Sequence, residues 1–389
     1  MDNLLEKDKG RIQSIDFLRG LIMIVMALDH VRDFFHITAQ TADPLDPATT
    51  TPALFFTRWI THFCAPTFVF LSGVSAYLSS RNKTKEEISL FLIKRGFWLV
   101  VVDLVIMSFA LTFDPAYHFI MLTVLWAIGW SMTLLGITLR LSARIILPIG
   151  LLLFFGHDLY SLIQLPMQSP LNKFLGILFT GRVILPVGAT HMIGFFYAIL
   201  PWTGVMFLGY WFGRHINHKK AMFLSGMGLI ALFFLLRLIN NYGEPVQWKT
   251  YGTSTQTTLS FFNATKYPPS LQFLAMTLGP SLLLLSMVVW KSSALQRFIS
   301  TYGKVPFFYY VVHFLLARVL IIVAFFATGH TASQLNDGRS PFLFRPFDFG
   351  FSLPVVYLVW VIVVAALYYP CRWFYRYKLA HKKWWLRYL

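Results

Sequence analysis

The sequence contains few charged residues for its length. Only 13% of its 389 residues are Asp, Glu, Lys or Arg, whereas an average soluble domain has about 25%. Hydrophobic residues make up 57% of the chain, and its mean hydropathy is +0.61. This composition leaves too little polar surface for a soluble protein of this size, which excludes a cytosolic enzyme and a disordered chain. The sequence therefore predicts a polytopic membrane protein.

Cysteine is equally scarce, and several catalytic motifs are missing. Cys64 and Cys371 lie far apart in the sequence, so neither a disulfide framework nor a thiolate metal site follows. The chain has no Walker loop, no dinucleotide-binding glycine motif after a strand, no zinc-protease motif and no serine nucleophile elbow. The segment Phe70–Gly73 is more typical of small residues at a helix interface. We expect no metal cofactor.

Long apolar runs predict an all-α fold of about ten transmembrane helices in one bundle. Crossing the hydrocarbon core takes about 20 mostly apolar residues. Residues 1–12 are then a cytoplasmic N-terminal segment, 13–371 the transmembrane domain and 372–389 a basic and aromatic cytoplasmic tail. The candidate spans are 13–31, 59–79, 96–113, 119–139, 145–157, 191–213, 221–240, 271–290, 305–328 and 351–371.

The basic residues are distributed unevenly between the two sides of this topology. If the N-terminus is cytoplasmic, most of the 33 Lys and Arg residues fall in inside segments, and the net charge of +17 lies on that face. This is the positive-inside pattern, which accounts for the basic charge without a nucleic-acid partner. Both termini are predicted to be cytoplasmic. A cleavable signal peptide is not expected, because the first eleven residues hold six charges.

The first predicted helix carries an unusual number of ionisable residues. Asp16, Arg19, His30 and Asp33 fall on one helical stripe, and Arg19 lies about 16 Å from His30 along the axis. Ionisable residues inside a membrane are costly to insert and therefore indicate function by default. The alternative interpretation is structural, with Asp16 and Arg19 forming an ion pair that locks the helix into the bundle.

His30 is the candidate general base near the outer end of this helix. The carboxylates of Asp29 and Asp33 lie close in sequence and could orient the imidazole and raise its basicity. His36 lies beyond the stripe and is a rival candidate. His62 begins the second span on the same outer side, where it could reach the same vestibule or simply lie at the membrane interface.

Three further ionisable residues are predicted deep in later spans. His313 lies near the middle of the ninth span, either as a neutral, hydrogen-bonded histidine or as a residue lining a channel between the two faces. Arg237 and Arg318 cannot lose their charge. They must therefore face a carboxylate, such as that of Asp103, or an anionic ligand.

Several segments resemble one family of membrane enzymes. The stretch Arg11–Gly20 and the apolar run up to His30 are similar to the opening helix of the heparan-α-glucosaminide N-acetyltransferase family. The interval from Arg19 to His30 also resembles the wider transmembrane acyltransferase superfamily. Further similar segments are Ala65–Gly73, Val124–Gly129, Leu200–Met206, Lys266–Ser270 and Tyr309–His313.

The resemblance implies an enzyme that moves an acyl group, commonly acetyl, from cytosolic acyl-CoA to an acceptor across the bilayer. It implies that an outer histidine is the base or a transient acyl carrier, which by spacing is His30. The animal lysosomal enzyme of the family has its essential histidine after an aromatic pair in the first luminal loop, a description that His36 also fits. The choice between the two histidines stays open.

Donor-side or channel roles are expected for Arg19, Asp16, His313 and Arg318. Acetyl-CoA or another acyl-CoA is the expected co-substrate, and the expected acceptor is an extracytoplasmic sugar, amino sugar or glycan. A bacterial inner membrane is the expected location, and a homodimer is allowed. The alternative function is a proton-coupled transporter or flippase. The chain shows no internal repeat of the kind such transporters often contain.

Overall fold

The computed structural model describes residues 12–388 apart from 164, 167, 290 and 336–337. The chain divides into two compact units, and the single transmembrane domain expected over 13–371 stays a prediction. Unit 1 combines the two ends of the chain, Met1–Cys64 and Met287–Leu389, and unit 2 is the central segment Ala65–Ser286. The expected N-terminal segment 1–12 lies almost entirely outside the described residues.

In unit 1, helix α2 contacts four other helices, α3, α14, α15 and α16. Proline occupies the first turn of α3, α15 and α16, where its missing N–H has no helical acceptor to lose. α16 continues nine residues past the expected boundary at 371, so the tail is helical at first. The elements are α2 (Gln13–Phe35), α3 (Pro52–Thr61), α14 (Ala294–Lys304), α15 (Pro306–Ala327), η4 (Ala332–Gln334), α16 (Leu353–Ala380) and η5 (Trp384–Arg387).

Two glycines allow α2 and α14 to touch through their backbones. A Cβ added at Gly20 would lie 2.0 Å from the carbonyl oxygen of Ile299, and one added at Gly303 would lie 1.9 Å from that of Asp16. Small residues permit this close approach where membrane helices cross. The crossing fixes α2, which carries the candidate histidine.

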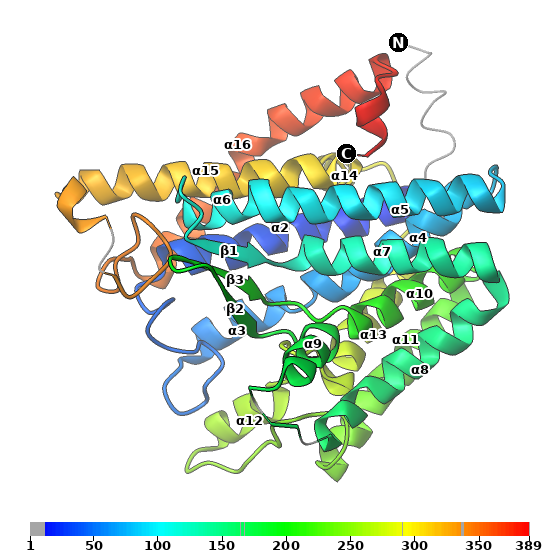
Figure 1. Cartoon of the computed structure of the whole chain (residues 1–389), viewed down its shortest axis with the longest axis horizontal. Helices are drawn as coiled ribbons and strands as arrows, with labels where there is room; N and C mark the ends of the chain where they lie inside the picture. Colours follow the sequence, from blue (N-terminus) through cyan, green and yellow to red (C-terminus); the bar gives the residue numbers. More distant parts are fainter. Residues whose placement is uncertain (1–11, 164, 167, 290, 336–337, 389) are drawn as a thin grey trace. The chain divides into compact units, whose positions relative to one another are not determined.

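Unit 2 is mainly helical, and α5 runs beside α7 (Figure 1). The Phe70–Gly73 segment behaves as expected for a helix interface, because Gly73 lies against the backbone of α10. The helices are α4 (Cys64–Ser80), α5 (Lys85–Val102), η1 (Asp103–Met107), α6 (Ser108–Thr112), α7 (Val124–Leu141), η2 (Ala143–Ile145), α8 (Ile146–Gly156), η3 (His157–Leu162), α9 (Pro170–Phe179), α10 (Leu200–Arg214), α11 (Lys219–Ile239), α12 (Ser254–Phe262) and α13 (Leu271–Met287).

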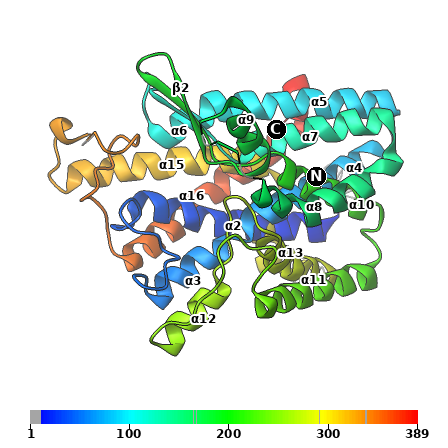
Figure 2. The same ribbon diagram turned by 60° about the horizontal axis from the view of Figure 1, so that its bottom comes forward.

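Unit 2 also contains a small sheet that the sequence did not predict. Its strands are β1 (Phe119–Leu122), β2 (Val183–Val187) and β3 (His191–Phe195), in the order β1-β3-β2. β3 pairs in parallel with β1 and antiparallel with β2, and β2 lies next to α9 (Figure 2). Two expected spans, 119–139 and 191–213, therefore begin as strands. Short apolar runs fit strands and helices equally well.

Six described helical segments are long and apolar enough to cross a membrane. Together with the composition, they identify an integral membrane protein. α2 has 23 residues but interrupts its apolar sequence with ionisable side chains. The count of ten and the side on which the termini lie stay predictions. The six are Pro52–Ser80, Val124–Leu141, Ala143–Leu162, Lys219–Ile239, Pro306–Ala327 and Leu353–Ala380.

Candidate functional site

The imidazoles of His30 and His313 meet inside unit 1. The Nδ1 atom of His30 on α2 lies 2.7 Å from Nε2 of His313 on α15, although 283 residues separate them. The His313 ring is completely buried, and the Phe314 ring lies 4.1 Å from that of His30. The structure thus joins the proposed base to one of the proposed channel residues.

Hydrogen bonding fixes which nitrogen of each neutral ring carries the proton. Nδ1 of His313 lies 3.0 Å from the carbonyl oxygen of Tyr309, and a carbonyl can only accept. His313 therefore donates from Nδ1 and accepts at Nε2. His30 must then donate from Nδ1, which leaves its Nε2 as the unprotonated, basic nitrogen. This is the tautomer that a general base acting through Nε2 requires.

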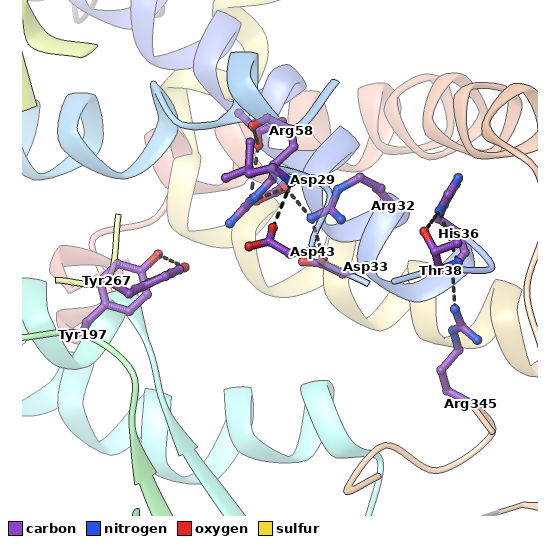
Figure 3. Close-up of polar contacts among 12 residues, drawn as sticks. Asp29, Arg32, Asp33, His36, Thr38, Asp43, Arg58, Tyr197, Tyr267 and Arg345 are labelled. Atoms are coloured by element: carbon purple, nitrogen blue, oxygen red, sulfur yellow. Dashed lines mark hydrogen bonds and ion pairs between the residues drawn. The ribbon is translucent and has the colours of Figure 1, made fainter. Parts of the chain in front are cut away.

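The neighbouring carboxylate belongs to an ion-pair cluster (Figure 3). Asp29 accepts hydrogen bonds from Arg32, at 3.1 Å, and from Arg58 on α3. Arg32 also donates to Asp33 at 2.6 Å, and the Asp33 side chain is 48% exposed. Two cations hold Asp29, so its carboxylate fixes α3 against α2. Its expected role in orienting the imidazole stays a prediction.

His36, the rival candidate, caps the C-terminal end of α2. Its Nδ1 accepts from the backbone N–H of Thr38 at 3.3 Å, and its carbonyl accepts from Arg345 (Figure 3). Burial, together with the charges of Arg32 and Arg345, lowers the pKa of His36. The ring is therefore neutral at neutral pH, with its proton on Nε2. This is the opposite tautomer to that of His30.

The expected donor-side residues lie at the other end of α2 and on α15. Arg19 forms an ion pair with Asp16 at 3.3 Å and donates to the Gly303 carbonyl at 3.2 Å. The ion pair favours the structural interpretation of these two residues. Arg318 is buried, donates to the carbonyl of Leu343 at 3.0 Å and lies over the Phe34 ring.

His62 is completely buried at the end of α3. It lies within the helix packing, and the structure gives it no exposed surface from which to form an outer vestibule. Its vestibule role stays a prediction. Among the described residues, no group of three His, Cys, Asp or Glu side chains is arranged to hold a metal ion.

Unit 2 uses its buried ionisable residues to satisfy backbone groups. Asp103 accepts from the backbone N–H groups of Thr123 and Trp126 and so caps α7. Arg237 donates to the carbonyls of Ser260, Phe261 and Asn263. Asp103 was one proposed partner for the buried arginines. The hydrogen bonds of Arg237 instead go to carbonyls and to the side chain of Gln272, at 3.2 Å.

The sequence interpretation missed three arginines that shape the C-terminal end of α2. They are Arg32, Arg58 and Arg345, all of them buried or nearly so. The spacing of Asp29 and Arg32 offered one signal, because residues three apart face each other on a helix. Nothing in the sequence placed Arg58 or Arg345 beside them.

Comparison with known protein families gives a match over much of the chain. The sequence profile of the family described as "Heparan-alpha-glucosaminide N-acetyltransferase, catalytic" matches residues 11–240, which is more than half of the chain. The comparison with curated proteins found no match. The profile match confirms the resemblance drawn from the sequence motifs.

Proposed function

Because this chain belongs to the family of the heparan-α-glucosaminide N-acetyltransferase catalytic domain, we propose that it is a membrane acyltransferase. It takes an acyl group, acetyl in the simplest case, from cytosolic acyl-CoA and transfers it to an amino sugar or glycan outside a bacterial inner membrane. The main support within the chain is the hydrogen bond between His30 and His313, which makes Nε2 of His30 basic.

The chemistry assigned to His30 is general-base catalysis. The acceptor nitrogen or hydroxyl oxygen attacks the thioester carbonyl, a new bond forms to the acyl carbon, and the bond to sulfur breaks. The acceptor proton moves to Nε2 of His30, which then gives it to the departing CoA thiolate and returns to its neutral form. While His30 is protonated, its Nδ1–H donates to His313, whose own Nδ1–H donates to the Tyr309 carbonyl. This chain disperses the transient positive charge.

His30 fits this role better than His36 does, because their tautomers differ. Nδ1 of His36 faces a backbone N–H, so His36 must lose a hydrogen bond before Nδ1 can take a proton. Its Nε2 already carries one. The lowered pKa of His36 also makes it a weaker base.

The test is acyl transfer by the full-length protein in liposomes. Radiolabelled acetyl-CoA is supplied to the side of the basic loops, and glucosamine or an envelope extract is supplied to the other side. Label should appear on the acceptor with the wild type and with His381→Ala, a variant of an exposed tail histidine. It should not appear with His30→Gln.

Two results would contradict the proposal. If the wild type transferred label neither to glucosamine nor to the envelope extract, the proposed acyltransferase activity would be contradicted. If His30→Gln transferred the acyl group at the wild-type rate and His36→Ala did not transfer it, His36 would be the general base instead.

The paired histidines also suit a second function, proton-coupled transport. An imidazole pair can pass a proton from one ring to the other, as a relay requires. A substrate-dependent pH change inside vesicles, in the absence of acyl-CoA, would favour transport over acyl transfer.

A further inference from the structure

An apolar groove lies between α2, α14 and α16, all of them in unit 1. Its volume is about 500 Å³, which is within the range of about 300–1,000 Å³ that small-molecule sites occupy. The Trp360 indole donates to the Ile24 carbonyl at 2.8 Å and joins α16 to α2. The side chains that line the groove are aliphatic or aromatic, and they include Ile24, Phe298, Trp360, Val364, Ala365 and Tyr368.

The groove lies along a helix that is exposed to lipid. α16 is one of the spans long and apolar enough to cross the membrane, and only 22% of its apolar window is buried. Val361, which also lines the groove, is 55% exposed. A hydrocarbon chain is therefore the occupant that the walls fit. Lipid tails are as apolar as these side chains, so the walls alone do not select one lipid over another.

A basic residue continues the wall of the groove towards the end of α16. Arg372 follows Tyr368 by four residues and so lies on the same helix face. It is exposed and forms no ion pair within the part of the chain that the structure describes. No acidic residue follows Asp348 in the sequence, so the charge on this part of unit 1 is uniformly positive.

Exposed aromatic residues mark the level of the lipid headgroups on α16. Tyr369 is 74% exposed and Trp373 is 61% exposed, and both are neighbours of Arg372 in the sequence. Tyrosine and tryptophan collect at the boundary between hydrocarbon and water. The guanidinium of Arg372 is thus placed where a lipid phosphate lies, at one end of an apolar groove.

We propose that this groove and Arg372 form a binding site for one anionic phospholipid. An acyl chain fills the groove, and the phosphate accepts hydrogen bonds from the Arg372 guanidinium, whose forked donors match two phosphate oxygens. The site prefers an anionic lipid, because the choline of a zwitterionic one offsets its phosphate charge. A bound chain packs α16 against α2, the helix that carries His30.

Photo-crosslinking tests the position of the lipid and the preference for its headgroup. The full-length protein is placed in phosphatidylcholine nanodiscs with a trace of phosphatidylglycerol that carries a diazirine in its acyl chain, or with the same trace of phosphatidylcholine that carries this chain. Mass spectrometry compares the label on residues 360–368 with the label at Val323 on α15, which is 60% exposed.

In the wild type, the phosphatidylglycerol probe should label 360–368 about five times as strongly as the phosphatidylcholine probe, relative to Val323. One basic residue near the membrane surface favours an anionic lipid by about this factor. Lipid that merely surrounds the protein would give the same ratio of groove label to Val323 label with both probes.

Three variants separate the headgroup contact, the groove and the general charge of the tail. Arg372→Gln should remove the fivefold preference but keep the labelling by both probes. Ala365→Trp fills the groove and should abolish the label on 360–368 while the label at Val323 persists. Lys382→Gln removes an exposed base of the tail and should change nothing. All three should unfold near the wild-type temperature in detergent, because the three residues are exposed.

Three results would overturn the site. They are equal labelling of 360–368 by the two probes in the wild type, a preference for phosphatidylglycerol that survives in Arg372→Gln, and a groove label that persists in folded Ala365→Trp. If Ala365→Trp does not fold, the first two comparisons still decide. Because the assay contains no acyl-CoA, failure of the proposed acyl transfer does not alter its result.

Discussion

In unit 1 the imidazoles of His30 and His313 hydrogen-bond to each other, whereas in unit 2 the hydrogen bonds of Asp103 and Arg237 go mainly to backbone groups. All four side chains are ionisable and lie in predicted spans. A backbone amide or carbonyl does not exchange a proton with the side chain that it meets. The imidazoles of His30 and His313 can pass a proton from one ring to the other.

This contrast shows that an ionisable residue at membrane depth is not sufficient evidence of function. Asp103 lies at the start of the π-helical segment η1 and caps α7, the helix that follows strand β1. Arg237 ties the end of α11 to the end of α12. Both serve the fold. What distinguishes His30 is the partner that it meets, which is itself titratable.

The largest expected effect is on catalysis by unit 1. His30→Gln keeps an amide N–H that can donate to His313 but removes the base. Acyl transfer should fall about 10²–10⁴-fold, the usual contribution of a general base, while the unfolding temperature stays near that of the wild type. Transfer rates in liposomes and thermal unfolding in detergent measure the two quantities. A variant with more than a tenth of the wild-type rate would place His30 with Asp103 among the structural residues.

The next largest effect is on stability in unit 2. Asp103→Ala leaves the N–H groups of Thr123 and Trp126 without their acceptor. The free energy of unfolding should fall by about 2–4 kcal/mol, because Asp103 is a helix cap and its loss leaves two backbone N–H groups without an acceptor. Asp103→Asn should lower the free energy of unfolding by less, because its amide oxygen can still accept a hydrogen bond from a backbone N–H group. Denaturant unfolding in detergent measures this. If Asp103→Ala lost acyl transfer while its stability stayed unchanged, Asp103 would have a role in catalysis instead.

Part of the fold followed from the sequence. Apolar runs long enough to cross the bilayer predicted the helices well, for example 305–328 against α15 at Pro306–Ala327. The sheet was missed because β1 and β3 are four and five residues long and continue into apolar helices. Periodicity cannot separate such short runs from a helix.

Only the part of the site that lies on α2 could be predicted from the sequence. The helical stripe placed His30 near the outer end of α2, but no spacing rule joins it to His313 across 283 residues. Asp29 was expected to orient the imidazole because it is adjacent in sequence, and this role stays a prediction. Its partners in the structure are Arg32, one turn on, and Arg58, on another helix.

A smaller effect should separate the two histidines of unit 1. His313→Phe keeps a ring for stacking but removes the acceptor for Nδ1 of His30. The rate of transfer at saturating substrate should fall about tenfold, with little change in KM, because His313 orients the base and does not bind substrate. Steady-state kinetics measure both parameters. A loss as large as that of His30→Gln would make His313 a proton acceptor in the reaction, as the relay of a transporter would need.

The smallest expected effect concerns His36 and the pH dependence of stability. Burial, with Arg32 and Arg345 nearby, lowers its pKa below the ordinary 6.5, so between the lowered value and 6.5 the unfolded chain binds more protons than the folded one. The stabilising contribution of neutral His36 is therefore complete above pH 6.5 and is lost as the pH falls through that interval. His36→Gln should flatten this part of the stability profile, whereas His381→Gln should not. An unchanged slope in His36→Gln would mean that His36 takes up its proton as readily in the folded protein as in the unfolded chain. The tautomer argument that favours His30 would then lose one of its two supports.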